Sequence, residues 1–143
     1  MADAVVLDAG VLVSLFVPQP TSDACIAFIN SCNAQPNFAC FAPDCIFYEV
    51  AAVLRKYERL GHYPTLSEDL QRLYDLPIIA VSCKDLMQTA ANISREHLIS
   101  AYDAFYLALS RHQGSALVTT DLRLVNGTQG KGFDVQFVGN VSV

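Results

Sequence analysis

The chain has 143 residues and a net charge of −5 at pH 7, which is the length of one ordinary domain and too short for two. Hydrophobic residues make up 52% of the sequence and charged residues 16%, so the composition excludes a disordered chain and favours an α/β fold with a buried sheet. The acidic balance opposes binding to nucleic acid through overall charge alone.

Targeting and redox signals are weak. No apolar run approaches the ~18 residues of a membrane span, and the opening residues MADAVVLD carry acids in place of a basic leader. Five cysteines without a C-x-x-C pair argue against a zinc site and a disulfide framework. We therefore expect a cytoplasmic protein with no membrane association.

The first chemical signal is an aspartate at the end of an apolar run. Residues Ala4–Gly10 have the sequence AVVLDAG, which is typical of a buried strand that ends at Asp8 and turns into a helix. In α/β proteins this edge of the sheet is where ligands bind. An aspartate after a strand is, however, more often the N-cap of the next helix, so both interpretations of Asp8 stay open here.

The next elements follow from prolines and periodicity. The apolar segment Val11–Val17 is broken by prolines before a helix that begins near Thr21. Phe38–Ala42 predicts a second strand. Pro43 stands at the start of a helix that runs to about Leu60.

That helix contains a second acid of interest. At ~100° per residue, its apolar side chains fall in one arc, with Arg55 and Arg59 opposite. Glu49 lies at the edge of the arc, where an ionised carboxylate needs a partner, and no Lys or Arg stands three or four positions away. A side chain that extends to water is the alternative interpretation.

Two helices and a strand are expected in the middle of the chain. Thr65–Tyr74 predicts a helix with solvated acids in its first turn. Ile78–Val81 lacks alternation, so we predict a strand buried on both faces. Lys84–Ser94 predicts a further helix.

A nearly apolar helix over Ser100–His112 contains a single acid, Asp103. Because it is apolar all round, we expect it to lie in the core between other elements. Ser100 and Asp103 have the spacing of a variant capping box. That structural role competes with a functional one for Asp103.

The end of the chain repeats the opening pattern. Ala116–Thr119 predicts a buried strand that brings Asp121 to its carboxyl end. Val125–Phe133 is rich in glycine and is expected to be irregular. Val135–Val138 predicts a last short strand.

Strands that alternate with helices imply parallel pairing with right-handed crossovers. We therefore predict an α/β fold of one domain over residues 1–143. Its architecture is a three-layer α/β/α sandwich with a central, mostly parallel sheet of four to five strands.

Four acids are expected at one edge of this sheet, because strand ends and the starts of the following helices share it. They are Asp8, Glu49, Asp103 and Asp121. Four carboxylates in one cleft repel one another and favour a cation. Carboxylate oxygens without clustered His or Cys suit Mg²⁺ or Mn²⁺.

Other chemistries lack their residues. The three histidines, His62, His97 and His112, share neither i, i+4 spacing nor a neighbouring cysteine, and we interpret them as surface or structural. Their positions disfavour a Ser-His-Asp triad. A glycine-rich phosphate loop ending in GK is absent from the sequence.

Four segments in order resemble the motifs of the PIN-domain family, and within it the VapC-type toxin ribonucleases. They are VVLDAGVLV, PDCIFYEVAAVLR, YDAFYLALS and LVTTDLRL. The resemblance extends over nearly the whole chain and implies that Asp8, Glu49, Asp103 and Asp121 bind metal. It assigns Thr119 as a supporting hydroxyl. One departure is Gly10, which stands where many members have Ser, Thr or Asn.

The resemblance implies an endoribonuclease that hydrolyses RNA phosphodiester bonds with Mg²⁺ or Mn²⁺. It also implies a homodimer and a cognate antitoxin protein. RNA contacts are expected from basic residues that are otherwise ordinary surface charges, namely Arg55, Lys56, Arg59 and Arg123. The four acids account for most of the net negative charge, so bound cations would remove the objection from overall charge.

Two other functions compete. A non-catalytic PIN-like module that binds RNA or protein is favoured only by Gly10. A phosphatase with an aspartyl-phosphate at Asp8 normally needs a second aspartate two residues on, where this chain has Gly10.

Overall fold

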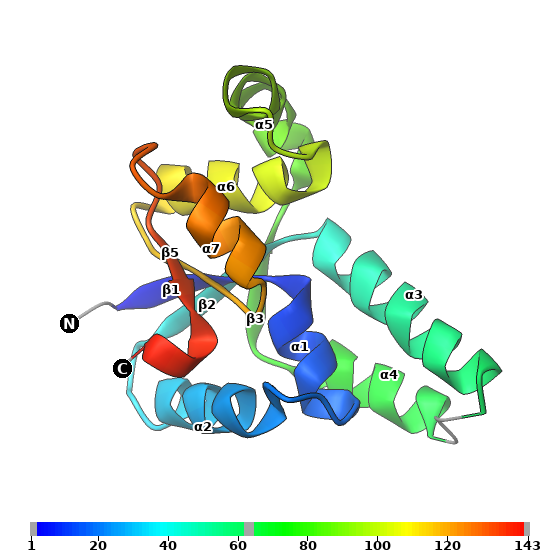
Figure 1. Ribbon diagram of the computed structural model, residues 1–143. Helices are drawn as coiled ribbons and strands as arrows, with labels where there is room; N and C mark the ends of the chain where they lie inside the picture. The colour runs from blue at the N-terminus through cyan, green and yellow to red at the C-terminus, as the bar shows by residue number, and fades with distance from the viewer. Residues whose placement is uncertain (1–2, 62–64, 142–143) are drawn as a thin grey trace.

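Five parallel strands form one sheet in the order β3-β2-β1-β4-β5 (Figure 1). The computed structural model describes residues 3–61 and 65–141. The strands are β1 Ala4–Leu7, β2 Ala39–Pro43, β3 Ile78–Val81, β4 Leu117–Thr119 and β5 Val135–Phe137. The predicted parallel sheet is therefore confirmed.

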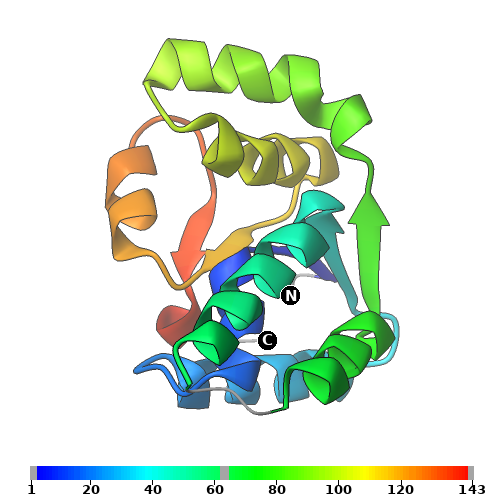
Figure 2. The same cartoon turned by 90° about the vertical axis from the view of Figure 1, so that its right-hand side faces the viewer.

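Helices cover both faces of the sheet (Figures 1 and 2). They are α1 Ala9–Phe16, α2 Ser22–Asn33, α3 Cys45–Arg59, α4 Leu66–Asp75, α5 Cys83–His97, α6 Ala101–Gln113 and α7 Leu122–Thr128, followed by the 3₁₀ turn η1 Val138–Asn140. Helix α6 lies against β1, β2 and β4, with α5 packed outside it. Helices α1, α2 and α4 lie on the other side, and α3 packs against α1. This arrangement confirms the three-layer sandwich.

The strand order reverses between β1 and β4. The chain proceeds from β1 outward through β2 to β3, then returns to β4 on the other side of β1 and continues to β5. In open parallel sheets such a reversal leaves a crevice at the carboxyl ends of the two central strands, and ligands bind there. Asp8 follows β1 and Thr119 ends β4, so both stand at this crevice.

Helix α6 is the buried helix that the sequence predicts. The buried residues of this helix are Ala104, Tyr106, Leu107, Ala108, Leu109 and Ser110. Ser100 caps its first turn, because the Ser100 Oγ accepts a hydrogen bond of 3.2 Å from the Asp103 N–H. The helix is thereby fixed between α5 and the sheet, and its start lies at the crevice.

The prediction that β3 is buried on both faces is wrong. Ile79 is 50% exposed, and Ala80 is also exposed. The reason is position: β3 pairs only with β2 and forms an edge of the sheet (Figure 2). An apolar run without alternation does not distinguish a central strand from an edge strand.

The prediction that residues 125–133 are irregular is wrong over its first part. Helix α7 extends through Thr128 in spite of Gly127. Its first turn is capped by Asp121, and its buried Leu124 and Thr128 hold it against the fold. The Thr128 hydroxyl donates to the Leu124 carbonyl at 2.8 Å, so packing and capping outweigh the poor helix propensity of glycine.

Two further sequence predictions concern membrane spans and His62. No helix among the described residues is long and apolar enough to span a membrane. The interpretation of His62 falls at residues 62–64, outside the described ranges.

Candidate active site

The centre of the crevice is a hydrogen-bonded link between two strand ends. The Thr119 hydroxyl donates to Asp8 Oδ2 at 2.5 Å and accepts from the Asp121 N–H at 3.0 Å. Thr119 is fully buried. One threonine therefore connects the acid after β1 with the acid after β4, which is the supporting position that the family resemblance implied.

Asp8 is held in an environment that disfavours its charge. Burial raises the pKa of its carboxyl to about 6, the Thr119 hydrogen bond opposes that rise, and the charges of Asp103 and Glu49 add to it. Although Asp8 occupies the N-cap position of α1, its side chain makes no capping hydrogen bond. The backbone of Ala9, the first residue of α1, lowers the pKa of this carboxylate, but the carboxylate is hydrogen-bonded to Thr119 and does not cap the helix.

Asp103 reaches the same region from the start of α6. Burial raises the pKa of Asp103, the Ser100 hydroxyl lowers it and the charge of Asp121 raises it. Capping and electrostatics coexist here. Ser100 accepts from the Asp103 backbone N–H and its hydroxyl also acts on the Asp103 carboxylate, while Asp103 lines the cavity described below.

Glu49 reaches the same crevice from the first half of α3. The Cys45 thiol donates to Glu49 Oε1 at 3.5 Å, a weak partner one turn earlier that the search for Lys and Arg missed. Burial raises the pKa of Glu49, the Cys45 and Tyr106 side chains lower it, and the charge of Asp103 raises it. Glu49 is half-buried rather than extended to water.

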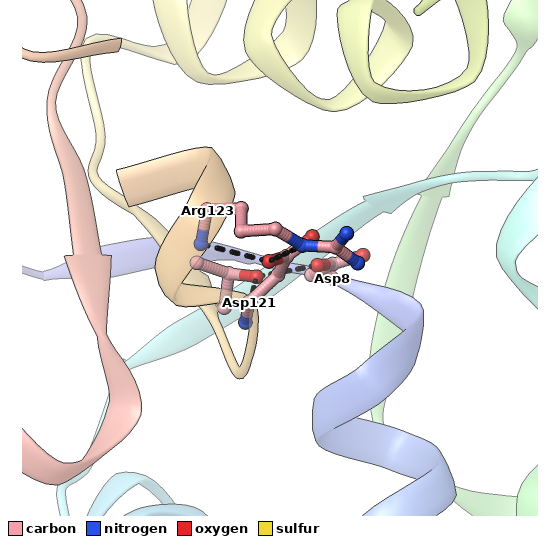
Figure 3. Close-up of polar contacts among 4 residues, drawn as sticks. Asp8, Asp121 and Arg123 are labelled. Atoms are coloured by element: carbon pink, nitrogen blue, oxygen red, sulfur yellow. Dashed lines mark hydrogen bonds and ion pairs between the residues drawn. The ribbon is translucent and has the colours of Figure 1, made fainter. Parts of the chain in front are cut away.

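Asp121 has a structural duty as well. Its Oδ1 accepts from the Arg123 N–H at 2.9 Å, so it caps α7, and the Arg123 side chain lies 3.8 Å from the same oxygen. Figure 3 shows Asp121 and Arg123 at the edge where Asp8 lies. The side chain of Asp121 is 42% exposed, so this acid lies at the rim of the crevice.

The four predicted acids thus face one region. Within the described residues, however, no three His, Cys, Asp or Glu side chains stand close enough to hold a metal ion as placed. Mg²⁺ commonly keeps several waters and uses one or two protein carboxylates. Because the donors are all carboxylates and repel one another, their chemistry suits a hard divalent cation such as Mg²⁺ or Mn²⁺ rather than zinc.

Tyr106 is a site residue that the sequence reasoning missed. It is 2% exposed, and the charges of Glu49, Cys45 and Asp8 add to the burial that raises its pKa. Its hydroxyl therefore lies beside the acids. The available signal was its spacing, three residues after Asp103 on the same face of a helix that is otherwise apolar.

The departure at Gly10 has a structural counterpart. A β-carbon at residue 10 would overlap the Thr120 Oγ1. The space that a side chain at position 10 would take is therefore filled by a threonine hydroxyl from the loop after β4. Serine at position 10 requires Thr120 to move.

A cavity of about 430 Å³ opens beside the outer acids. Asp103 and Asp121 line one part of it, and His97, Arg123 and Lys131 line another. Of the predicted RNA contacts only Arg123 lies here. Lys131 was not predicted, because its segment was expected to be irregular.

The other predicted RNA contacts lie apart from this cavity. Arg55, Lys56 and Arg59 surround a separate hollow of about 190 Å³ on α3. From Glu49 to Arg59 the helix rises ~15 Å along its axis. Arg55 also pairs with Glu58 at 3.2 Å. The structure does not bring these three residues to the acids.

Comparison with known proteins assigns the chain. The PIN domain family model matches residues 5–127, which include all four acids. The chain belongs to the PIN domain family. The resemblance read from the four motifs is therefore confirmed, and the match runs from β1 into α7.

One curated protein and several solved structures are similar to the chain. The chain is 28% identical to Ribonuclease VapC3 of Pyrobaculum aerophilum over 126 residues, which cover 83% of this chain and 90% of that protein. Among solved structures it is similar to PAE2754 from Pyrobaculum aerophilum, with a TM-score of 0.67, 18% identity, and coverage of 94% of this chain and 89% of that one. A toxin-antitoxin complex from Klebsiella pneumoniae gives a TM-score of 0.64 at 15% identity and covers 96% and 99%.

Proposed function

We propose that this PIN domain protein is a VapC-type toxin ribonuclease that hydrolyses RNA phosphodiester bonds with Mg²⁺ or Mn²⁺. The observation that carries the proposal is the partly buried Asp8, whose carboxylate accepts a hydrogen bond from Thr119 and faces the charges of Asp103 and Glu49. A carboxylate in that setting is stabilised by a cation more than by water. The similarity to Ribonuclease VapC3 supports RNA as the substrate.

The chain's own residues have separable roles in this proposal. Asp8, Glu49 and Asp103 hold the cation, Asp121 adds charge at the outer side, and Thr119 fixes the orientation of Asp8. A divalent ion held there would supply a water of lowered pKa and offset the negative charge that develops on the phosphate. No side chain needs to form a covalent intermediate.

The substrate is expected in the cavity beside the outer acids. Arg123 and Lys131 place positive charge next to Asp103 and Asp121, where a phosphate on either side of the cleaved bond can bind. Because only 9 Lys and Arg oppose 14 acids in the whole chain, affinity for RNA depends on such local placement and on bound cations.

Partners follow from the relatives. Similarity to a toxin-antitoxin complex supports a cognate antitoxin protein for this chain. We further expect a homodimer that acts in the cytoplasm, where its RNA substrate is made.

The test is an RNA cleavage assay of the full chain with Mn²⁺, Mg²⁺ or EDTA. We expect cleavage only with a divalent cation, and a loss of at least about 100-fold in Asp8→Asn and Asp103→Asn, since each removes a charge that the cation needs. Asp44→Asn is the matched control, because Asp44 also follows a strand at this sheet edge but is exposed and lies outside the acid cluster.

Two results would contradict the proposal. Cleavage in EDTA would show that the reaction needs no divalent cation. An Asp8→Asn variant as active as the parent would show that Asp8 is not part of the active site. Binding of RNA without any cleavage under all conditions would favour the non-catalytic module.

A further inference from the structure

One buried hydroxyl at the site has no partner. Among the residues that the structure describes, the Tyr106 hydroxyl oxygen is the one buried side-chain polar atom that makes no hydrogen bond. Buried polar groups in folded proteins are almost always paired, and a native exception calls for an explanation such as a bound ion or a functional role. The Tyr106 side chain is 2% exposed. Its hydroxyl is therefore buried without the hydrogen bond that would offset the cost of burial.

The surroundings of that hydroxyl are the proposed cation ligands. The side chains whose charges act on this hydroxyl are Glu49, Cys45 and Asp8, and a phenol hydroxyl is a hydrogen-bond donor at neutral pH. In return, the Tyr106 hydroxyl lowers the pKa of Glu49. The two side chains are therefore close, although they do not meet hydrogen-bond geometry as placed.

Glu49 needs a stronger partner than it has. Its hydrogen bond comes from the Cys45 thiol at 3.5 Å, and a thiol is a weak donor. Asp8 differs, because a threonine hydroxyl fixes it at 2.5 Å. The Asp8 carboxylate is therefore oriented by a hydroxyl, and the Glu49 carboxylate by a thiol alone.

We propose that Tyr106 is a positioning residue whose hydroxyl donates to Glu49 and holds this carboxylate toward Asp8 as a cation ligand. The inference rests on the proposed function. In this arrangement Glu49 accepts from the Tyr106 hydroxyl in place of the weak Cys45 thiol. The Tyr106 hydroxyl then orients the Glu49 carboxylate as the Thr119 hydroxyl orients the Asp8 carboxylate. The Glu49 carboxylate is therefore in position before a cation binds.

The test is Mn²⁺ binding to the full chain without RNA, followed by the electron paramagnetic resonance signal of free Mn²⁺. Tyr106→Phe removes only the hydroxyl. Partners that orient metal ligands are worth about 10–100-fold in metal affinity, so we expect the dissociation constant for Mn²⁺ to rise by about tenfold or more. The melting temperature in EDTA should stay the same or rise, because the hydroxyl lost there is unpaired.

Two controls separate positioning from packing. Tyr102→Phe makes the same chemical change on the same helix at a side chain that is 76% exposed, and it should bind Mn²⁺ like the parent. In a Glu49→Gln background, Tyr106→Phe should add little further loss, since the hydroxyl acts through Glu49.

The failures are distinguishable. If the parent binds no Mn²⁺, the proposed function itself is wrong. If the parent binds Mn²⁺ and Tyr106→Phe binds it equally well, or if the losses from Glu49→Gln and Tyr106→Phe are fully additive, the assignment of Tyr106 is wrong and the proposed function stands.

Discussion

The ends of β1 and β2 carry the same residue type in opposite electrostatic states. The two strands pair in parallel, so Asp8 after β1 and Asp44 after β2 stand at the same edge of the sheet. Burial raises the pKa of Asp8 to about 6. Hydrogen bonds from Cys83 lower the pKa of Asp44.

The difference lies in what surrounds each carboxylate. Asp44 is exposed, and its Oδ1 accepts a 3.0 Å hydrogen bond from the Cys83 N–H at the first residue of α5, where a negative charge is favoured. Asp8 lies where the strand order reverses, beside two other acids. A strand-end aspartate is therefore a cap or a ligand according to the neighbours that the fold supplies.

The largest effect expected from this comparison is on stability without metal. In EDTA at pH 7.5 we expect Asp8→Asn to raise the free energy of unfolding by about 1–3 kcal/mol, because a carboxylate ionised at a cost is removed. Asp44→Asn should change it by less than about 1 kcal/mol, since the amide oxygen can accept the same bond. Urea denaturation measures both. A destabilised Asp8→Asn would show that burial of Asp8 is not costly.

The pH dependence has a definite sign. The pKa of the Asp8 carboxyl rises from an ordinary 3.8 to about 6 in the fold, so its stabilising contribution is complete below about pH 3.8 and is lost as pH rises through 6. The lowered pKa of Asp44 acts oppositely, because its stabilising contribution is fully present above about pH 3.8 and is lost as pH falls through the lowered pKa.

Unfolding of the parent and of Asp8→Asn in EDTA from pH 4 to pH 7 isolates the first of these effects. The parent should lose up to ~3 kcal/mol relative to the variant over this range. A constant difference between the two would mean that the pKa of Asp8 is not raised.

A smaller effect concerns the space beside Asp8. Gly10→Ser should destabilise the protein by about 1–2 kcal/mol, because the new β-carbon overlaps the Thr120 Oγ1. The variant that combines Gly10→Ser with Thr120→Gly should recover most of the lost stability, measured as melting temperature. Equal destabilisation in the single and double variants would show that Thr120 is not the obstacle.

The smallest effect lies at the outer rim of the site. Arg123 has a side chain that is 96% exposed, so Arg123→Ala should leave stability unchanged and raise the KM for RNA by about 3–10-fold at low salt. The slope of log KM against log salt should fall by about one, as for the loss of one phosphate contact. Arg95→Ala removes the same charge from α5 and serves as the control; an equal effect there would mean that Arg123 acts only through net charge.

Much of this could be predicted from the sequence, because it depends on local pattern. The strands, the buried helix α6 and the four acids follow from apolar runs and from acids placed at their ends. The errors arose where tertiary position decides the outcome. The edge location of β3 exposes Ile79, and packing of Leu124 and Thr128 maintains α7.

The partners of the acids could not be predicted for the same reason. Thr119 was named from the family resemblance, whereas Tyr106 and Cys45 carried no motif that pointed to Glu49. Asp44 has the same local pattern as Asp8, a strand followed by a helix. The family motifs assign a role to Asp8 and none to Asp44, and the fold gives the physical reason, because it buries Asp8 near Glu49 and Asp103.

The most direct test is a crystal structure of the parent protein grown with Mn²⁺ and measured for anomalous scattering of manganese. The account predicts a manganese peak in contact with the Asp8 carboxylate, directly or through one water, on the side that faces Glu49 and Asp103. A structure that binds manganese only elsewhere, or that leaves Asp8 bonded to Thr119 alone at millimolar Mn²⁺, would contradict it.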